Sequence, residues 1–236
     1  MHASAPSNAF AAALASITLL GPLAVHLFLP LMPSVQREFA ISTAAAGAAF
    51  SITLATMAVA TLAYGSLSDR YGRRPVLLGG LALFLCGSAL CLAAGSITTL
   101  FVGRLLQAAG AGVGLTLSRA IARDVYGPDQ LVKVIAYITM AYALGPMLAP
   151  PLGGVLNDTF GWRAGFALAL GAGLAVGLAA YRILREARPV AARTRSAPLL
   201  GCYWALLREP VFDSFVLQTG FRPACSSRWQ RPRRSS

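Results

Sequence analysis

Charged residues are scarce in this chain of 236 residues: Asp, Glu, Lys and Arg together make up 12%, and only 8 residues are acidic. An ordinary soluble domain is about 25% charged. Hydrophobic residues make up 56% of the chain, more than one soluble core of this size can bury. A lipid bilayer is the solvent in which such a composition is stable. The shortage of charge therefore excludes an ordinary soluble protein and predicts an all-α membrane protein.

Histidine and cysteine are also rare, with 2 and 4 copies. The cysteines follow no zinc-site spacing, and they stand at Cys86, Cys91, Cys202 and Cys225. A membrane enzyme needs several His, Cys or acidic side chains at one depth. The apolar runs hold no acidic residue, and apart from Cys86, Cys91 and Lys133 near the start of the fifth run they offer only His26 and Arg104. No glycine-rich phosphate loop is present for ATP. We therefore expect no enzyme, no metal and no cofactor.

Six apolar runs are each close to the ~20 residues that cross a bilayer, and they cover 10–31, 44–64, 76–95, 98–118, 131–156 and 164–181. The segments between them, including 33–42, 65–75 and 119–130, are predicted loops. Loops after the second, fourth and sixth runs hold twelve Lys and Arg when Lys133, at the start of the fifth run, is counted with the fourth, against two in the other loops. By the positive-inside rule, the N-terminus and the basic loops are cytoplasmic. The net charge of +12 thus reflects topology, and nucleic-acid binding is not expected.

The composition changes after residue 181, where the six-span region 1–181 ends. Residues 182–209 hold six arginines and are predicted to be a basic cytoplasmic linker. A partial seventh span follows at 210–220, at about half of the length that a bilayer requires. Residues 221–236 hold five arginines, and we expect them to be out-of-frame or chimeric coding. A natural basic tail is the alternative.

An internal repeat links two turns of the chain. The segment GSLSDRYGRR at 65–74 recurs 89 residues later as GVLNDTFGWR at 154–163, with five of ten positions identical. Each copy closes the second span of a three-span unit, yet the charge count places the first copy inside and the second outside. Two three-helix units of opposite topology form the inverted repeat of many secondary transporters. Chance similarity between two glycine-containing turns is the alternative.

The segment GSLSDRYGRRPVLL at 65–78 resembles motif A, the cytoplasmic loop signature of the major facilitator superfamily. The resemblance implies the six-helix N-terminal bundle of that fold, with a 3+3 inverted repeat and a partial seventh helix. Glycine permits the tight turn, and Asp69 can sit at a helix N-terminus and pair with the arginines. In the family this cluster latches the two halves on the cytoplasmic side, and here it comprises Gly65, Asp69, Arg70, Gly72, Arg73 and Arg74. Charges that only set topology are the alternative.

The segment RLLQAAGAGVG at 104–114 resembles motif B of the same family. An arginine inside a span is costly and usually functional; a snorkelling arginine at the helix end is the alternative. The resemblance predicts Arg104 and Gln107 in the cavity for substrate and protons. The glycines at 110, 112 and 114 let neighbouring backbones come close.

The segment GPMLAPPLGG at 145–154 resembles motif C, which is associated with drug/proton antiporters, with Ala149 in place of the usual glycine. Proline removes a helix hydrogen bond and bends the helix, while small residues allow a close crossing. The predicted packing residues are Gly145, Pro146, Ala149, Pro150, Gly153 and Gly154. A generic kinked membrane helix is the alternative.

The segment VHLFLPLMP at 25–33 resembles the first-helix signature of the Bcr/CflA subgroup of drug exporters. That signature commonly has an aspartate where this chain has His26. Imidazole titrates near physiological pH, so His26 is a candidate group for proton coupling or for the substrate cavity. A neutral histidine that is hydrogen-bonded inside the bundle is the alternative.

The resemblance as a whole implies a proton-coupled multidrug efflux transporter, a drug:H⁺ antiporter in a bacterial inner membrane, in truncated form. Its expected partners are a drug-like small molecule, the proton, the lipid bilayer and the missing C-terminal half, and no nucleic acid. A proton gradient supplies the energy. An inactive six-span remnant and a non-transporting membrane protein are the alternatives, and the substrate is not specified by these residues.

Overall fold

The computed structural model describes residues 8–184, which form seven helices and no strand. These residues all fall in one compact unit, residues 1–194. The predicted partial seventh span, the tail and all but the first residues of the predicted linker lie outside the described residues. The helices are α1 (Asn8–Phe39), α2 (Thr43–Tyr71), α3 (Arg73–Leu92), α4 (Ile97–Ala111), α5 (Val113–Val125), α6 (Pro128–Phe160) and α7 (Arg163–Ile183).

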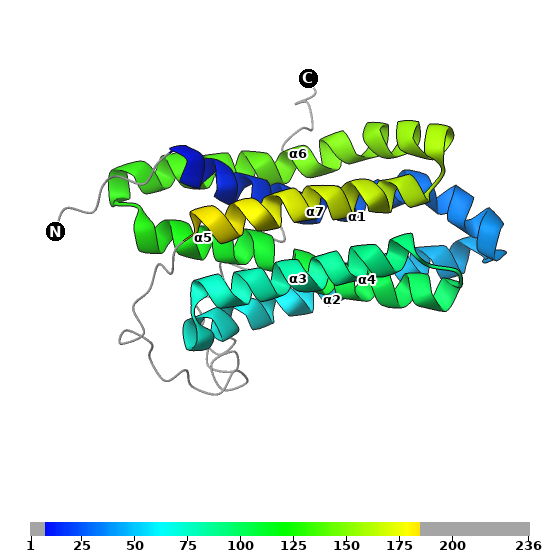
Figure 1. The fold of residues 1–236 in the computed structure, drawn as a ribbon, viewed down its shortest axis with the longest axis horizontal. Helices are drawn as coiled ribbons and strands as arrows, with labels where there is room; N and C mark the ends of the chain where they lie inside the picture. The colour runs from blue at the N-terminus through cyan, green and yellow to red at the C-terminus, as the bar shows by residue number, and fades with distance from the viewer. Residues whose placement is uncertain (1–7, 185–236) are drawn as a thin grey trace, which may run out of the picture. The chain divides into compact units, whose positions relative to one another are not determined.

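Within the described residues, six helical segments are long and apolar enough to cross a membrane, with α4 and α5 counted as one segment from Ile97 to Val125. They correspond one by one to the six predicted runs. The shortest, α3, has 20 residues, which at ~1.5 Å per residue reaches about 30 Å, the thickness of the hydrocarbon core. The helices run alongside one another (Figure 1). The predicted six-span architecture is therefore present.

Every spanning segment except α3 is longer than its predicted apolar run, so the predicted loops 33–42, 65–75 and 119–130 are largely wrong. Of the segment 33–42, only 40–42 lies outside a helix; of 65–75, only Gly72; and of 119–130, only 126–127. The prediction took polar residues as the end of each helix. A helix satisfies its own backbone hydrogen bonds, and so it continues through polar residues at the edge of the bilayer.

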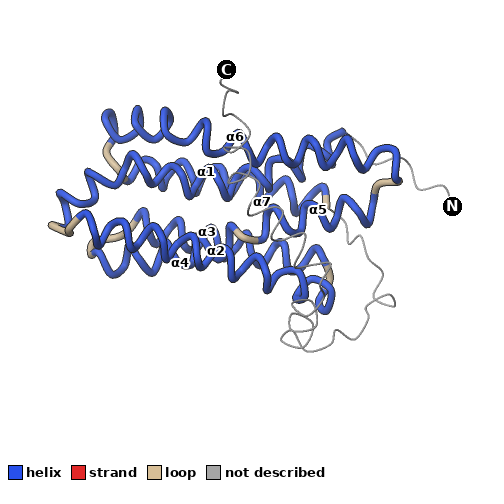
Figure 2. Tube along the Cα trace, turned by 180° about the vertical axis from the view of Figure 1, so that it is seen from behind, coloured by secondary structure: helices blue, strands red, loops and turns tan. Residues whose placement is uncertain are grey.

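The connections gather at two ends of the bundle (Figures 1 and 2). Residues 40–42, 93–96 and 161–162 lie at one end, which we call the Gly161 end. Gly72, residues 126–127, the start of α1 and the end of α7 lie at the other, the Gly72 end. Helices α1 and α6 pack side by side, as do α3 and α4.

Three closely spaced glycines let the fourth span pack against three different helices. A Cβ atom at Gly110 would overlap the backbone of Phe84 in α3. A Cβ at Gly112 would lie 3.0 Å from the Met57 carbonyl oxygen in α2, and one at Gly114 would lie 2.7 Å from the Ile17 carbonyl oxygen in α1. The close approaches expected from the sequence are therefore present, and Gly112 is also where α4 ends and α5 begins.

The two copies of the internal repeat share their backbone conformation. Gly72 has φ 100° and ψ 156°, and Gly161, at the matching position, has φ 80° and ψ 171°. They are the only glycines with positive φ in the described residues. This region of backbone space is essentially restricted to glycine. The two copies of the repeat therefore share the backbone conformation of a turn as well as identical residues.

Candidate functional site

Arg104 of α4 is enclosed by neighbouring helices, with 3% of its surface exposed. Its guanidinium carbon lies 4.6 Å from the ring centroid of Phe28 and 6.0 Å from that of Phe166. Its Nη1 donates to Gln107 Oε1 at 2.7 Å and to the Ala24 carbonyl at 3.3 Å. Aromatic faces stabilise a cation that water does not reach. This burial is incompatible with an arginine that snorkels to the membrane surface.

Gln107 continues the polar chain from Arg104 to α3. Its Nε2 donates to Ser88 Oγ at 2.8 Å, and Ser88 Oγ donates to the Phe84 carbonyl at 2.8 Å. Gln107 is itself buried. The structure thus brings Arg104 and Gln107 together, as their spacing of one turn predicts. Ser88 was missed by sequence reasoning, because a single serine in an apolar run carries no signal.

Two nitrogen atoms of Arg104, Nε and Nη2, are buried and make no hydrogen bond within the described part of the chain. The acidic residues of the described chain all lie in the first or last turn of a helix, and none lies near the middle of a span. They are Glu38, Asp69, Asp124, Asp129 and Asp158. A buried donor without a partner is unfavourable by about 1–3 kcal/mol, and by more when it is charged. Arg104 therefore has spare capacity to bind an acceptor.

A cavity of about 340 Å³ lies beside Arg104, between α2 and α4. Arg104 is its only charged lining residue; the others are Ala45, Ala48, Ala49, Ile52, Thr53, Phe101 and Leu105. The small alanines of α2 leave the space open. An apolar pocket with one strongly polar group is a common design for small-molecule binding.

His26 does not join this group. Its ring Nδ1 lies 2.8 Å from the Pro22 carbonyl oxygen, and the structure records no contact between His26 and Arg104. Ala24 and Phe28 are the α1 residues that meet Arg104. His26 is two residues from each of them, so its side chain leaves the helix about 200° around the axis from theirs. The predicted grouping of His26 with Arg104 and Gln107 is therefore not found.

His26 lies on the face of α1 that packs against α6. A Cβ atom at Gly145 would lie 2.6 Å from Pro22 Cβ, and one at Gly153 would lie 2.5 Å from Pro30 Cγ. His26 is one turn from each of these prolines. In the same register, the residue of α6 opposite His26 is Ala149, which is fully buried. This register places Ala149 opposite His26 at the α1–α6 crossing.

The remaining motif C residues do not share this packing face. Pro150 is exposed, Pro146 is partly exposed, and α6 continues through both. Among the residues that the structure describes, no atom lies within 4 Å of a Cβ placed on Gly154. Among the glycines of this motif, the close crossing of α1 and α6 thus uses Gly145 and Gly153.

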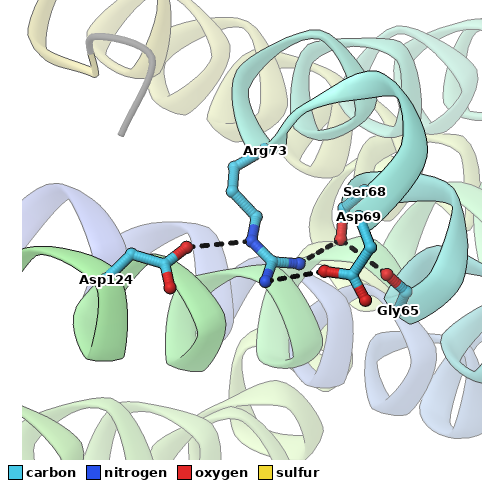
Figure 3. A network of polar contacts seen from close by, with 5 residues as sticks. All are labelled: Gly65, Ser68, Asp69, Arg73 and Asp124. Atoms are coloured by element: carbon cyan, nitrogen blue, oxygen red, sulfur yellow. Dashed lines mark hydrogen bonds and ion pairs between the residues drawn. The ribbon is translucent and has the colours of Figure 1, made fainter. Parts of the chain in front are cut away.

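At the Gly72 end, Arg73 is the centre of a polar network (Figure 3). Its Nη2 contacts Asp69 Oδ1 at 2.9 Å, and its Nε donates to Asp124 Oδ2 at 3.1 Å. Its Nη1 donates to Ser68 Oγ, and Ser68 Oγ donates to the Gly65 carbonyl at 2.8 Å. Arg73 thereby joins α2, α3 and α5.

The predicted position of Asp69 at a helix N-terminus is wrong. Asp69 lies in the last turn of α2, where the helix dipole is unfavourable for an anion. Arg73 offsets this. The other arginines point elsewhere: Arg70 lies 5.4 Å from the Tyr71 ring centroid, and Arg74 donates to the Tyr181 carbonyl of α7 at 3.0 Å.

A second cluster, at the Gly161 end, was not predicted. Arg163 Nη1 donates to Glu38 Oε1 at 2.9 Å, and its Nη2 donates to the Ala94 carbonyl at 2.8 Å. Trp162 Nε1 donates to Glu38 Oε2. The Trp162 ring also packs edge-on against Phe166, with centroids 5.9 Å apart. These contacts tie the ends of α1 and α3 to the start of α7.

The two clusters correspond through the internal repeat. Arg73 aligns with Trp162, and they bind acids at the ends of α5 and α1. Arg74 aligns with Arg163, and both donate to a backbone carbonyl at the end of the third helix of the opposite unit, Tyr181 in α7 or Ala94 just after α3. Aligning the repeat copies was the signal that could have located Trp162 and Arg163.

The chain matches the family model described as Major Facilitator Superfamily over residues 14–231. The chain belongs to the major facilitator superfamily. It is 34% identical over 201 residues to Multidrug resistance protein D of Escherichia coli (strain K12), a match that covers 84% of this chain and 50% of that protein. It is 33% identical over 204 residues to Multidrug resistance protein MdtL of Klebsiella pneumoniae (strain 342), covering 86% of this chain and 52% of that protein.

Solved structures of transporters share the fold of this superfamily member. The human organic anion transporter MFSD10 (TETRAN) matches with a TM-score of 0.65 and 23% identity, over 82% of this chain and 51% of that one. The peptide transporter POT in complex with sulfate matches with a TM-score of 0.70 and 19% identity, over 91% and 46%. The chain spans about half the length of the curated relatives it matches. Together with its six membrane-capable helices, this membership identifies a multi-pass membrane protein of a transporter family.

Proposed function

We propose that this chain serves the efflux of drug-like molecules across a bacterial inner membrane, as part of a Bcr/CflA-type drug:proton antiporter that works by alternating access. The relatives named multidrug resistance proteins support this at 33–34% identity. The observation that carries the proposal is Arg104, a buried cation beside an apolar cavity, with two nitrogen atoms that have no hydrogen-bond partner in the described residues. In this proposal, the Gly72 end faces the cytoplasm and the Gly161 end faces outward.

The cavity beside Arg104 suits a molecule with an apolar body and one hydrogen-bond acceptor. Ala45, Ala49 and Phe101 supply apolar walls, and Arg104 supplies the polar contact. Gln107 accepts a hydrogen bond from Nη1, so a ligand acceptor would bind Nε or Nη2, which have no partner in the described residues. Apolar walls with one fixed polar group discriminate weakly among apolar shapes, which fits the transport of several drugs.

His26 is the proposed proton carrier. It is the only His, Asp or Glu in the described residues that lies away from a helix end. Its Nδ1 is engaged with the Pro22 carbonyl, so Nε2 is the nitrogen that can take up a proton. A charge gained there would lie against Ala149 in the α1–α6 crossing. Protonation of His26 would therefore change the packing of α1 on α6, on the side of α1 opposite to the one that contacts Arg104.

A second transporter half is the proposed partner of α2 and α6. Within their most apolar windows, 11% of residues in α2 and 22% in α6 are buried, against 61% in α1. Alternating access requires one half to move against the other around a central site. The two least buried helices carry the surfaces on which such a half would pack, which on α6 include the exposed Met147, Leu152 and Val155.

Drug resistance conferred on an efflux-deficient bacterium tests the proposal. The chain is expressed alone and together with the second half of Multidrug resistance protein D, and growth is scored against a panel of drugs. Resistance to at least one drug class is expected when both halves are present, and Arg104→Ala should abolish it. Arg182→Gln, which removes a charge from the end of α7, is the control and should retain it.

Proteoliposomes test the energy source. Drug uptake driven by an imposed pH gradient is expected for the two-half transporter and should be lost in His26→Ala. Drug uptake that does not depend on the pH gradient would contradict proton coupling. Equal drug resistance with Arg104→Ala and with the wild-type chain would contradict the role of Arg104 in binding.

A further inference from the structure

A second and larger cavity, of about 760 Å³, lies at the Gly72 end between the start of α1 and the first half of α6. We call it the α1–α6 groove. Alanines on one face of α1, including Ala11 and Ala15, make it hollow, and Met140 and Leu144 of α6 form its opposite wall. It shares no lining residue with the cavity beside Arg104.

The groove has a polar mouth and an apolar interior. Asn8, Gln130 and Lys133 line it within the first two turns of α1 and α6. From Lys133 to Leu144, α6 advances about 16 Å, and only Tyr137 adds a further polar atom on the α6 side. A site that is charged at one end and apolar along its length fits an amphipathic molecule that enters from the membrane surface.

An unpaired hydroxyl marks where the head of such a molecule would bind. Tyr126 lines the groove with only 8% of its surface exposed, and its hydroxyl is buried with no hydrogen-bond partner in the described part of the chain. Its ring is fixed by Phe10, with centroids 6.1 Å apart. A buried hydroxyl without a partner is unfavourable, so an acceptor oxygen supplied by a ligand would satisfy it.

The charges at the mouth favour an anion. Lys133 is exposed and faces the groove. Helix α6 begins at Pro128, and no side chain of the described part of the chain caps it. A helix N-terminus attracts negative charge. Asp129, in the first turn of α6, opposes this attraction but does not line the groove.

We propose that the α1–α6 groove binds an anionic phospholipid. The phosphate oxygens accept hydrogen bonds from Lys133 and Tyr126, and one acyl chain lies between Ala15 of α1 and Leu144 of α6. Anionic lipids are concentrated on the cytoplasmic face of membranes, where the arginine count of the loops places the Gly72 end. This binding site is separate from the proposed transport site, and its test does not depend on transport.

Native mass spectrometry of the purified full chain tests the site. Dioleoylphosphatidylglycerol is added in one arm, dioleoylphosphatidylcholine in a second, and inorganic phosphate as competitor in a third. Retention of phosphatidylglycerol is expected, with weaker retention of phosphatidylcholine. Lys133→Gln and Tyr126→Phe should each weaken phosphatidylglycerol binding about tenfold, the effect of losing one hydrogen bond to a charged group. Arg182→Gln removes a charge at the same end outside the groove and should bind as wild type does.

A variant that keeps every charge separates the groove from general charge effects. Ala12 is exposed and lines the groove, so Ala12→Trp fills it without disturbing buried packing, and it should weaken binding of both lipids. Equal retention of the two lipids by wild type, or unchanged binding in both Lys133→Gln and Ala12→Trp, would overturn the proposal. Displacement by inorganic phosphate alone would instead indicate a free-phosphate site and would overturn it as well.

Discussion

At the Gly72 end, Arg73 joins Asp69 of α2 to Asp124 of α5, whereas at the Gly161 end Trp162 and Arg163 both bind Glu38 of α1. The aligned position occupied by Arg73 in the first copy and Trp162 in the second thus uses different chemistry at the two ends. Where the first copy has a cation between two carboxylates, the second has an indole with one N–H and a large apolar surface.

Because of this difference, the two ends of the bundle are held together by different interactions. Trp162 belongs to a buried apolar cluster with Phe28, Leu31 and Phe166, so the Gly161 end is held largely by packing. Asp158, which aligns with Asp69, is exposed and pairs with no arginine in the described residues. The Gly72 end is held by charge, and a charge network can exchange partners without repacking a core. The proposed latch to a second transporter half fits the Gly72 end for this reason.

Among the substitutions of charged residues, the largest effect is expected from Arg73→Ala. A fully buried pair that loses one partner costs about 3–5 kcal/mol, and the partial exposure of Asp69 and Asp124 lowers the expected loss to about 2 kcal/mol. The melting temperature of the purified chain should fall by several degrees. Arg73→Lys keeps the charge but not the planar fork and should lose less. If Arg73→Ala melts as wild type does, the network does not hold this end.

The two glycine turns should respond alike, because their backbones are alike. Gly72→Ala and Gly161→Ala each force a side chain into a positive-φ region, at a cost of about 1–3 kcal/mol. Gly65→Ala and Gly154→Ala are matched controls in the same repeat copies, inside helices and with open space around the new Cβ. They should be neutral or slightly stabilising. Melting curves of the four variants decide, and a loss at only one turn would contradict the structural repeat.

Trp162→Phe separates packing from hydrogen bonding at the Gly161 end. The ring contact with Phe166 is kept, while the N–H that Glu38 accepts is lost. The expected destabilisation is about 1 kcal/mol, less than that of Arg73→Ala. Trp162→Ala removes both interactions and should cost clearly more. Equal melting temperatures for the Phe and Ala variants would show that packing contributes nothing.

The smallest effect is expected from Arg163→Gln. The side chains of Arg163 and Glu38 are 43% and 42% exposed, and exposed ion pairs contribute about 0.2–1 kcal/mol. Raising the salt concentration should remove most of the difference from wild type. A loss as large as that of Arg73→Ala, and insensitive to salt, would mean that both ends depend on charge equally.

The six spans and the repeat could be predicted from the sequence, because apolar length and a spaced glycine pattern are local signals. Helix ends could not, since Glu38, Asp69 and Asp124 are polar residues that remain helical at the bundle edge. The partners of Arg73 and Arg163 could not either. Asp124 is 51 residues from Arg73 and Glu38 is 125 residues from Arg163, and only the packing of the helices brings them together.

The site around Arg104 was predictable only along its own helix. Gln107 is one turn away, so spacing alone places it beside Arg104. Phe28 and Phe166 come from α1 and α7, and no local pattern distinguishes them from other aromatic residues. The grouping with His26 failed because sequence depth along a helix does not determine which face a side chain occupies.

Cysteine labelling at two matched positions tests the inverted repeat most directly. Tyr71 and Phe160 each precede the turn glycine of their repeat copy, and both are exposed. Each is replaced by cysteine in a chain whose four native cysteines are serine, and intact cells are treated with a membrane-impermeant maleimide. We predict that Phe160→Cys is labelled in intact cells, and that Tyr71→Cys is labelled only after the membrane is permeabilised. Labelling of both positions from the same side would contradict the account.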